Sequence, residues 1–272
     1  IVLHDEEKIR AKKLGIKDFN KKYNIDEMVK GDVIFCATGV TTGDLAKGVE
    51  DLGNEYKVTT FALHKSKKII KTISNIYNKR ISKYNKTPKA VIWKIKISQD
   101  LRLNIILDKI LNISNNNKFS IADIGCGYGR LYEIIKDRNL DRKAQYYGFD
   151  INKKFIQFCK NNKDFENVKF EISAYPLKDT DFVVMSGTYN LTPTNNISLW
   201  EDYIIKNLTN NWKFVGKAMI FNCLLKDKKT INKSLYYTEL TWIKKICEKN
   251  FCNPEIIKHN LLKDDITVIL KK

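Results

Sequence analysis

The sequence contains no long apolar run and few of the residues that build metal sites. No apolar stretch approaches the roughly 18 residues of a membrane-spanning helix, and the N-terminus lacks the basic-then-apolar pattern of a signal peptide. The six cysteines form no Cys-x-x-Cys pair, and only three histidines are present, which argues against a zinc site and favours reduced, buried thiols. We therefore expect a cytoplasmic protein with no membrane association and no bound metal.

Arginine is also scarce, although the formal charge is +18. Only six of the 49 basic residues are arginine, and residues 51–100 hold 12 basic and 3 acidic groups, so that +9 of the excess lies in under a fifth of the chain. Recognition of phosphates and base edges favours the planar guanidinium group over the ammonium group of lysine. We interpret the charge as a solvated basic linker, with a nucleic-acid site as the alternative.

The length of 272 residues and the hydrophobic content of 43% suit a globular core in one large domain or two modest ones. The chain begins with Ile1 rather than Met, and we expect it to be a piece of a longer protein.

The first organised region covers residues 1–80. A short buried strand is predicted at residues 33–37, a turn of small residues at 38–43, one or two helical turns at 44–49, and two further strands at 56–63 and 68–76. These elements are too few to bury a core of their own. The turn at 38–43 is interpreted as an ordinary tight turn, with a phosphate-binding loop as the alternative.

One long run in this region carries a family resemblance: Asp32-Val33-Ile34-Phe35-Cys36-Ala37-Thr38-Gly39-Val40-Thr41-Thr42-Gly43-Asp44-Leu45. With shorter matches at residues 10–16, 26–31, 47–49 and 58–60, it resembles the C-terminal tail of the class II (bacterial-type) fructose-1,6-bisphosphatases. The resemblance covers about the last quarter of such an enzyme. It implies that the metal-binding acids of the family lie upstream, so that residues 1–80 have no phosphatase activity.

Residues 81–90 are polar, basic and interrupted by Pro88, and they are the predicted linker. The second region, residues 91–272, alternates strand and helix patterns. Strands are predicted at 119–124, 146–150, 168–172, 181–185, 218–223, 256–259 and 266–270, and helices at 103–111, 130–136, 153–161, 198–208 and 240–248. The predicted fold is therefore α/β: a Rossmann-like sheet of seven strands, mostly parallel, with an antiparallel C-terminal hairpin. We expect this region to fold without the residues that precede it.

Chemistry is expected where the first strand meets its helix. Glycines at 125, 127 and 129 allow a ligand close to the backbone, and the following helix N-terminus offers free N–H donors. A dinucleotide fingerprint would place its last glycine at position 130, which is Arg130. Asp150 ends the second strand, 21 residues beyond Gly129, where a carboxylate can accept both hydroxyls of a ribose. A strand-to-helix turn without a ligand is the alternative.

Two stretches at this point carry a second resemblance: Asp123-Ile124-Gly125-Cys126-Gly127-Tyr128-Gly129 and Phe149-Asp150-Ile151. They are similar to the first motif and the acidic second-strand end of the class I S-adenosylmethionine-dependent methyltransferases. Further residues that share this likeness are Trp93, Gln99 and Arg102 and those at 181–191, 221–224, 235–237 and 265–270. The resemblance implies S-adenosylmethionine as cofactor. The residues expected to bind it are Asp123, Gly125, Cys126, Gly127, Gly129, Asp150 and Ile151. Ser173-Ala174-Tyr175 stands where many members place an acidic residue near the adenine.

The methyl acceptor is expected beyond the fourth strand, at the edge where ligands of open α/β sheets bind. This loop lacks the Asp/Asn-Pro-Pro-aromatic pattern of enzymes that methylate amines of nucleic-acid bases, so we expect a small molecule, such as a polar metabolite or sugar derivative, and no nucleic acid. No catalytic base is assigned. The candidate substrate residues are Ser186, Gly187, Tyr189, Asn190, Tyr236 and Tyr237.

Three functions thus remain from the sequence. The first is methyl transfer from S-adenosylmethionine to a small molecule. The second, for residues 1–80, is the C-terminal part of a sugar bisphosphatase whose catalytic portion lies upstream. The third is a basic binding protein whose Rossmann-like domain binds no cofactor.

Overall fold

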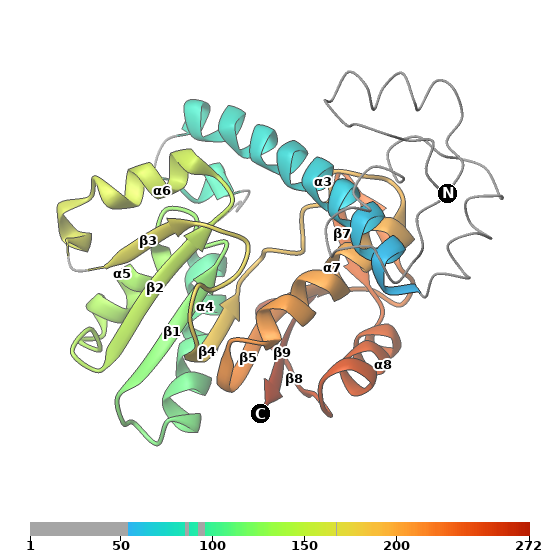
Figure 1. Cartoon of the computed structure of the whole chain (residues 1–272). Helices are drawn as coiled ribbons and strands as arrows, with labels where there is room; N and C mark the ends of the chain where they lie inside the picture. The colour runs from blue at the N-terminus through green and yellow to red at the C-terminus, as the bar shows by residue number, and fades with distance from the viewer. Residues whose placement is uncertain (1–53, 85–86, 92–95, 167) are drawn as a thin grey trace, which may run out of the picture. The chain divides into compact units, whose positions relative to one another are not determined.

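The computed structural model of the chain describes residues 54–84, 87–91, 96–166 and 168–272 (Figure 1). It divides into two compact units, residues 1–71 and 72–272. The strand, turn and helix predicted within residues 33–49 lie outside the described residues. Among the helices that are described, none combines the length and apolar character needed to cross a membrane.

A single helix, α3 (Asn54–Tyr84), occupies the segment for which two strands were predicted. The prediction of strands at 56–63 and 68–76 was wrong, and residues 81–84 of the predicted linker are also helical. The reason is visible in the spacing of Ile73, Tyr77, Ile81 and Tyr84, which recur every three or four residues and so share one face of a helix. A short 3₁₀ turn, η3 (Pro88–Val91), follows.

The second unit alternates strands and helices along the chain. Its predicted elements are confirmed within four residues at each end, except that the helix predicted at 103–111 begins seven residues earlier. They are α4 (Lys96–Ile113), β1 (Phe119–Ile124), α5 (Arg130–Asp137), β2 (Ala144–Asp150), α6 (Lys153–Lys160), β3 (Lys169–Ile172), β4 (Thr180–Met185), α7 (Ile197–Trp212), β5 (Val215–Leu225), α8 (Leu240–Asn250), β8 (Glu255–Lys258) and β9 (Asp265–Lys271). Three short elements were not predicted: η4 (Lys163–Phe165), β6 (Thr230–Asn232) and β7 (Leu235–Thr238).

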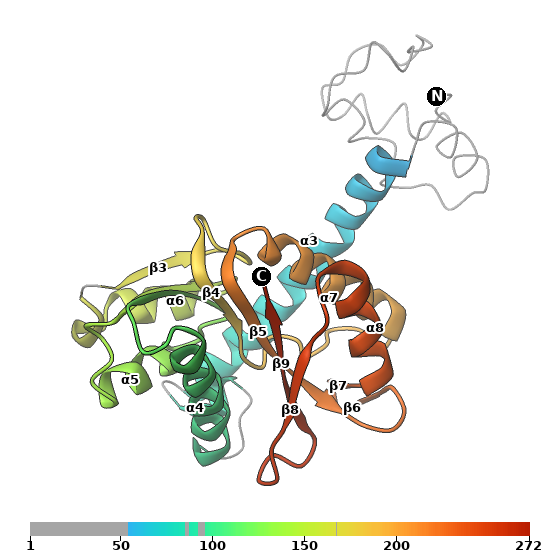
Figure 2. The ribbon, with the colours of Figure 1, turned by 90° about the horizontal axis from the view of Figure 1, so that it is seen from below.

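The strands form one sheet with the order β3-β2-β1-β4-β5-β7-β6 (Figure 1 and Figure 2). Strands β1 to β5 are parallel, whereas β9 pairs with β5 in antiparallel register from Ala218↔Lys271 to Leu224↔Asp265, and β8 pairs with β9. The mostly parallel sheet and its antiparallel hairpin are therefore confirmed. The predicted number of seven strands becomes nine because β6 and β7 extend the sheet, β7 in parallel with the end of β5.

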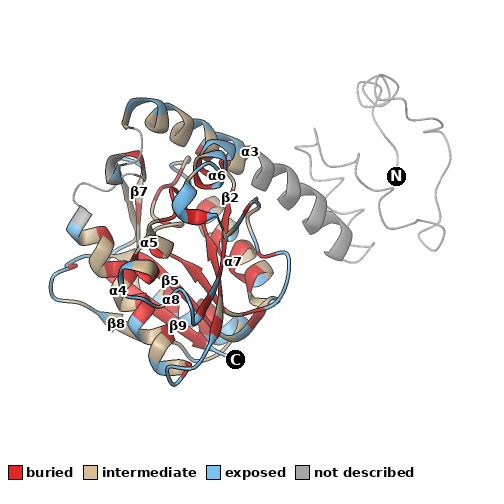
Figure 3. Cartoon of the chain, turned by 90° about the vertical axis from the view of Figure 1, so that its left-hand side faces the viewer, coloured by how far each residue is buried: buried red, intermediate tan, exposed pale blue. Residues whose placement is uncertain are grey.

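The core lies between the sheet and its helices (Figure 3). Buried side chains of α4, α5 and α6 pack against alternate residues of the strands, among them Ile121 of β1, Val184 of β4 and Ile220 of β5. At one end of this core Arg102 of α4 forms a buried ion pair with Asp265 of β9. Because strands β1 to β4 run in parallel, their carboxyl ends meet at one edge of the sheet, where a ligand site is expected.

Candidate functional site

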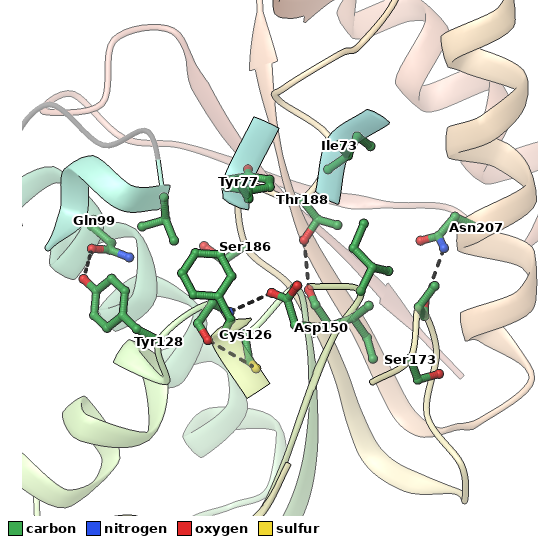
Figure 4. A pocket seen from close by; sticks show the side chains of 18 of the residues that line it. Ile73, Tyr77, Gln99, Cys126, Tyr128, Asp150, Ser173, Ser186, Thr188 and Asn207 are labelled. Carbon is green, nitrogen blue, oxygen red and sulfur yellow. Dashed lines mark hydrogen bonds between the residues drawn. The ribbon is translucent and has the colours of Figure 1, made fainter. Parts of the chain in front are cut away.

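An open cavity of about 810 Å³, a volume that includes solvent space at its mouth, lies at this edge of the sheet (Figure 4). The loops after β1, β2, β3 and β4 all contribute to its walls, together with helices α3 and α7. The lining residues are Ile73, Tyr77, Val91, Gln99, Ile124, Gly125, Cys126, Gly127, Tyr128, Asp150, Ile151, Phe155, Ser173, Ala174, Ser186, Gly187, Thr188, Tyr203 and Asn207.

The glycine loop after β1 forms the floor of the cavity. Gly125 has a φ of 79°, and a Cβ at this position would lie 2.8 Å from Oγ1 of Thr188. That hydroxyl donates a hydrogen bond of 2.9 Å to the carbonyl oxygen of Ile124, which joins the loops after β1 and β4. Glycine is therefore required by backbone conformation and by space, and the loop leaves its backbone open to a ligand.

Asp150, at the end of β2, is the charged group of the cavity wall and is 6% exposed. Its Oδ1 accepts a hydrogen bond of 2.7 Å from the backbone N–H of Asn152, and its Oδ2 accepts one of 3.0 Å from the N–H of Gly127. Burial raises the pKa of this carboxyl group to about 6, and the two backbone donors oppose that rise. A carboxylate offers about four acceptor positions, so the ionised group retains capacity for two further donors.

Asp123 of β1 supports the loop but does not line the cavity. Its Oδ2 accepts a hydrogen bond of 2.6 Å from the hydroxyl of Tyr146, and burial raises its pKa to about 7. Gly129 likewise lies outside the cavity, in the left-handed conformation that precedes α5. Over the described parts of the chain, no group of three or more His, Cys, Asp or Glu side chains is arranged to hold a metal ion.

The structure brings together seven of the residues predicted for the site: Gly125, Cys126, Gly127, Asp150, Ile151, Ser186 and Gly187. The aromatic candidates for the acceptor side have other partners. Tyr189 is buried, and its hydroxyl bonds Oδ1 of Asn207 at 2.7 Å. The hydroxyl of Tyr236 donates to Glu201 at 2.5 Å, and the ring of Tyr237 lies 4.3 Å from Nζ of Lys226. Asn190 accepts a backbone hydrogen bond from Tyr236 and does not line the cavity.

The far end of the cavity joins the loop after β3 to helix α7. Side-chain amides of Asn207 and Asn211 each donate a hydrogen bond of 3.3 Å to the carbonyl oxygen of Ala174. Tyr203, one helical turn before Asn207, also lines the cavity. The sequence analysis did not identify Tyr203 or Asn207 as site residues, although their spacing of four on an amphipathic helix places them on one face.

At the opposite end, Gln99 of α4 and Tyr128 of the glycine loop form a buried pair. The Tyr128 hydroxyl donates to Oε1 of Gln99 at 2.7 Å, and both residues line the cavity (Figure 4). The first motif contained Tyr128 as a variable position, so the sequence alone carried no signal for its role.

Residues 1–77 match the family of bacterial, glpX-encoded fructose-1,6-bisphosphatases. The class 2 fructose-1,6-bisphosphatase 2 of Escherichia coli is 38% identical over 60 residues, which is 22% of this chain and 18% of that enzyme. A class 2 fructose 1,6-bisphosphatase/sedoheptulose 1,7-bisphosphatase of Synechococcus is 30% identical over 76 residues, 28% of this chain and 22% of that enzyme. The chain thus spans about a fifth of the length of these enzymes.

Solved structures resemble the fold. A S-adenosylmethionine-dependent methyltransferase of Leishmania major superposes with a TM-score of 0.55 at 13% identity, over 84% of this chain and 90% of that one. The 1,6-didemethyltoxoflavin-N1-methyltransferase of Burkholderia thailandensis, solved with 1,6-didemethyltoxoflavin and S-adenosylhomocysteine, gives 0.52 at 9% identity, over 74% and 88%.

A candidate methyltransferase of Mycobacterium tuberculosis is 24% identical over 157 residues, which is 57% of this chain and 93% of that protein. Residues 115–272 match the family model described as a methyltransferase domain. That match covers more than half of the chain, with the glycine loop and Asp150 inside it. The chain therefore belongs to the methyltransferase-domain family.

Proposed function

We propose that this chain transfers a methyl group from S-adenosylmethionine to a small polar acceptor. One observation carries the proposal: the Asp150 carboxylate and the glycine loop face the same cavity at the carboxyl edge of a parallel sheet. The arrangement offers a carboxylate for a diol and accessible backbone for the rest of an elongated ligand. The structural neighbours with S-adenosylmethionine or its product in their names support this choice of cofactor.

The residues present fit this cofactor. The two N–H donors that bind Asp150 leave its remaining lone pairs for the ribose hydroxyls. The backbone at Gly125 and Gly127, which a Cβ would obstruct, faces the space next to Asp150. Ser173 and Ala174 line the end of the cavity beyond Asp150, where the adenine is proposed to bind, and Asn207 donates a hydrogen bond to the carbonyl oxygen of Ala174.

The cofactor supplies a methyl group activated by its sulfonium charge. The protein has to align the acceptor with that group and exclude water, because the displacement disperses charge rather than creating it. We assign the acceptor side to Ser186, Gly187 and the adjacent Thr188, which follow β4 and line the cavity. The hydroxyl of Thr188 is already engaged with the carbonyl of Ile124, so its role is to hold the two loops together.

A small acceptor is favoured over nucleic acid by two observations. The loop after β4 lacks the motif of base-methylating enzymes, and the basic residues are mainly lysine. The toxoflavin methyltransferase, which shares the fold, is named for a small-molecule acceptor.

Calorimetric titration of the full chain with S-adenosylhomocysteine tests the cofactor. We expect saturable binding and a rise in the thermal midpoint, since a ligand that binds only the folded state stabilises it. Even weak specific sites fill at roughly millimolar ligand, so the absence of both heat and thermal shift at that concentration would refute the proposal.

Filter binding and label transfer test the acceptor. Methyl-labelled cofactor is incubated with a small-molecule extract, with tRNA and with DNA, and label is expected in the first fraction alone. Binding of DNA or RNA is expected to be weak and to fall steeply with salt near about 150 mM, as for nonspecific charge contacts. Label recovered in tRNA or DNA would contradict the small-molecule assignment.

A further inference from the structure

The second half of α3 contributes to the cavity although it precedes the methyltransferase-domain match. Ile73 and Tyr77 line the cavity, and Figure 4 places both side chains above the loop that carries Asp150. Burial and the charge of Asp150 both raise the pKa of Tyr77, so the phenol lies within electrostatic reach of that carboxylate. The predicted domain start at residue 91 would leave these two residues outside the domain.

Asn152 attaches this half of α3 to the end of β2. Its side chain is fully buried, and Nδ2 donates to the carbonyl oxygen of Ser74 at 3.0 Å and to Oδ1 of Asn78 at 3.1 Å. Its Oδ1 accepts from the N–H groups of Lys154 and Phe155 at the start of α6. Its own backbone N–H donates to Asp150. One residue thus connects α3, α6 and the carboxylate of the cavity.

An apolar cluster completes the attachment. The buried side chains of Ala90, Tyr128 and Phe155 form its centre, and Tyr77, Ile81 and Tyr84 of α3 pack against them. The rings of Tyr77 and Phe155 meet edge to face with centroids 5.8 Å apart. Phe155 and Tyr128 also line the cavity, so a side chain lost from this face of α3 changes the cavity wall directly.

We propose that residues 72–84 are part of the cofactor site itself, with Tyr77 as a binding residue and Asn152 as the residue that positions the helix over Asp150. The inference rests on the proposed function. It adds that the functional methyltransferase unit includes a segment whose first residues, 72–77, also match the bisphosphatase family. Ile73 and Tyr77 of this helix line the cavity, and both lie outside the domain match.

Calorimetry of single variants in the full chain tests the proposal, with S-adenosylhomocysteine as the probe. Replacing Tyr77 by alanine removes the ring and is expected to raise the Kd about tenfold or more, whereas Tyr77→Phe keeps the ring and is expected to stay within about threefold. Lys79→Ala, at an exposed position of the same helix, is the matched control and should leave the Kd unchanged.

The positioning role has its own variant and readout. Asn78→Ala removes one acceptor of Asn152 but leaves the start of α6 intact, and it is expected to raise the Kd several-fold. Hydrogen exchange of residues 72–84 in the wild type should slow when the probe binds, because the helix then has a ligand beneath it.

The outcomes separate this inference from the proposed function. A wild-type chain that binds no probe refutes the proposed function, with Asp150→Ala as the reference for lost binding. A wild type that binds, with an unchanged Kd in Tyr77→Ala, overturns the inference, and a lower thermal midpoint alone would show a structural role. If Tyr77→Ala fails to fold, unaltered exchange of residues 72–84 on probe binding overturns the inference as well.

Discussion

Replacing Asp150 with alanine should weaken the binding of S-adenosylhomocysteine by about 2–4 kcal/mol, which corresponds to a Kd about 30- to 1,000-fold higher. The magnitude follows from two hydroxyl donors on a carboxylate that is 6% exposed, at roughly 1.5–3 kcal/mol for each charge-assisted bond, less what water restores in the variant. The backbone donors of Gly127 and Asn152 also lose their acceptor, so the loop itself becomes less ordered.

The pKa of about 6 for Asp150 adds a pH dependence to the same prediction. Since the ionised carboxylate is the better acceptor, the Kd should be constant above about pH 7 and should rise toward tenfold per pH unit well below pH 6. The pH dependence of folding stability has the opposite sign to that of binding. A folded-state pKa above the unfolded value of 3.8 means that this group's contribution is most favourable at low pH and is lost as pH rises through 6.

Calorimetry from pH 8 to pH 5 on wild type, Asp150→Ala and Asp150→Asn checks both parts. The Asn variant should bind weakly with a flat pH profile, and at pH 8 its thermal midpoint should be no lower than that of the wild type, because a buried charge has been removed. Asp141→Asn, at an exposed position after α5, serves as control. An unchanged affinity in Asp150→Ala would refute the assignment of Asp150 to the ribose.

Three further outcomes are expected. Gly125→Ala should lose roughly 1–3 kcal/mol of stability and most probe binding, because its φ of 79° and the 2.8 Å approach to Thr188 Oγ1 leave no place for a Cβ. Chemical denaturation measures the loss of stability and calorimetry measures the loss of binding. Full binding would contradict the geometry. Trp200 is fully buried, and its indole N–H donates a hydrogen bond to the carbonyl oxygen of Tyr189. Trp200→Ala should lower the free energy of unfolding by about 3–5 kcal/mol in the same denaturation assay, and a loss under about 1 kcal/mol would count against close packing there. The full chain should release no phosphate from fructose 1,6-bisphosphate with Mg²⁺ or Mn²⁺, and activity that persists through repeated purification would contradict the expectation that residues 1–80 have no phosphatase activity.

The parallel sheet could be predicted from the sequence because its signals are local. The run at residues 119–124 is mainly apolar and is followed by glycines, and it forms β1 over the same residues. Strand β7, in contrast, pairs with β5 only through Leu224↔Tyr237 and Leu225↔Thr238. A strand of that length depends on its neighbour for stability, so its own residues carried too little pattern.

The candidate site, like the sheet, could be predicted only in part from the sequence. Asp150 and the glycine loop were predictable because their spacing along the chain is itself the signal. Ile73, Tyr77 and Asn207 come from helices that are distant in sequence, and a helix pattern does not tell which residues reach a cavity. The region of α3 was also assigned to strands, since its isoleucines and tyrosines favour strands when the helical spacing is overlooked.

Strand β9 has a consequence for how the chain acquires its structure. It covers one edge of β5 over seven paired positions, although β6, β7, α8 and β8 lie between the two strands in sequence. During synthesis, β5 is made well before β9 and leaves the ribosome with the backbone N–H and C=O groups of that edge unpaired. A chain stopped before residue 265 would retain an exposed central edge, which is a template for association with other chains. Completion of the sheet, and with it protection from aggregation, therefore waits for β9 to be translated.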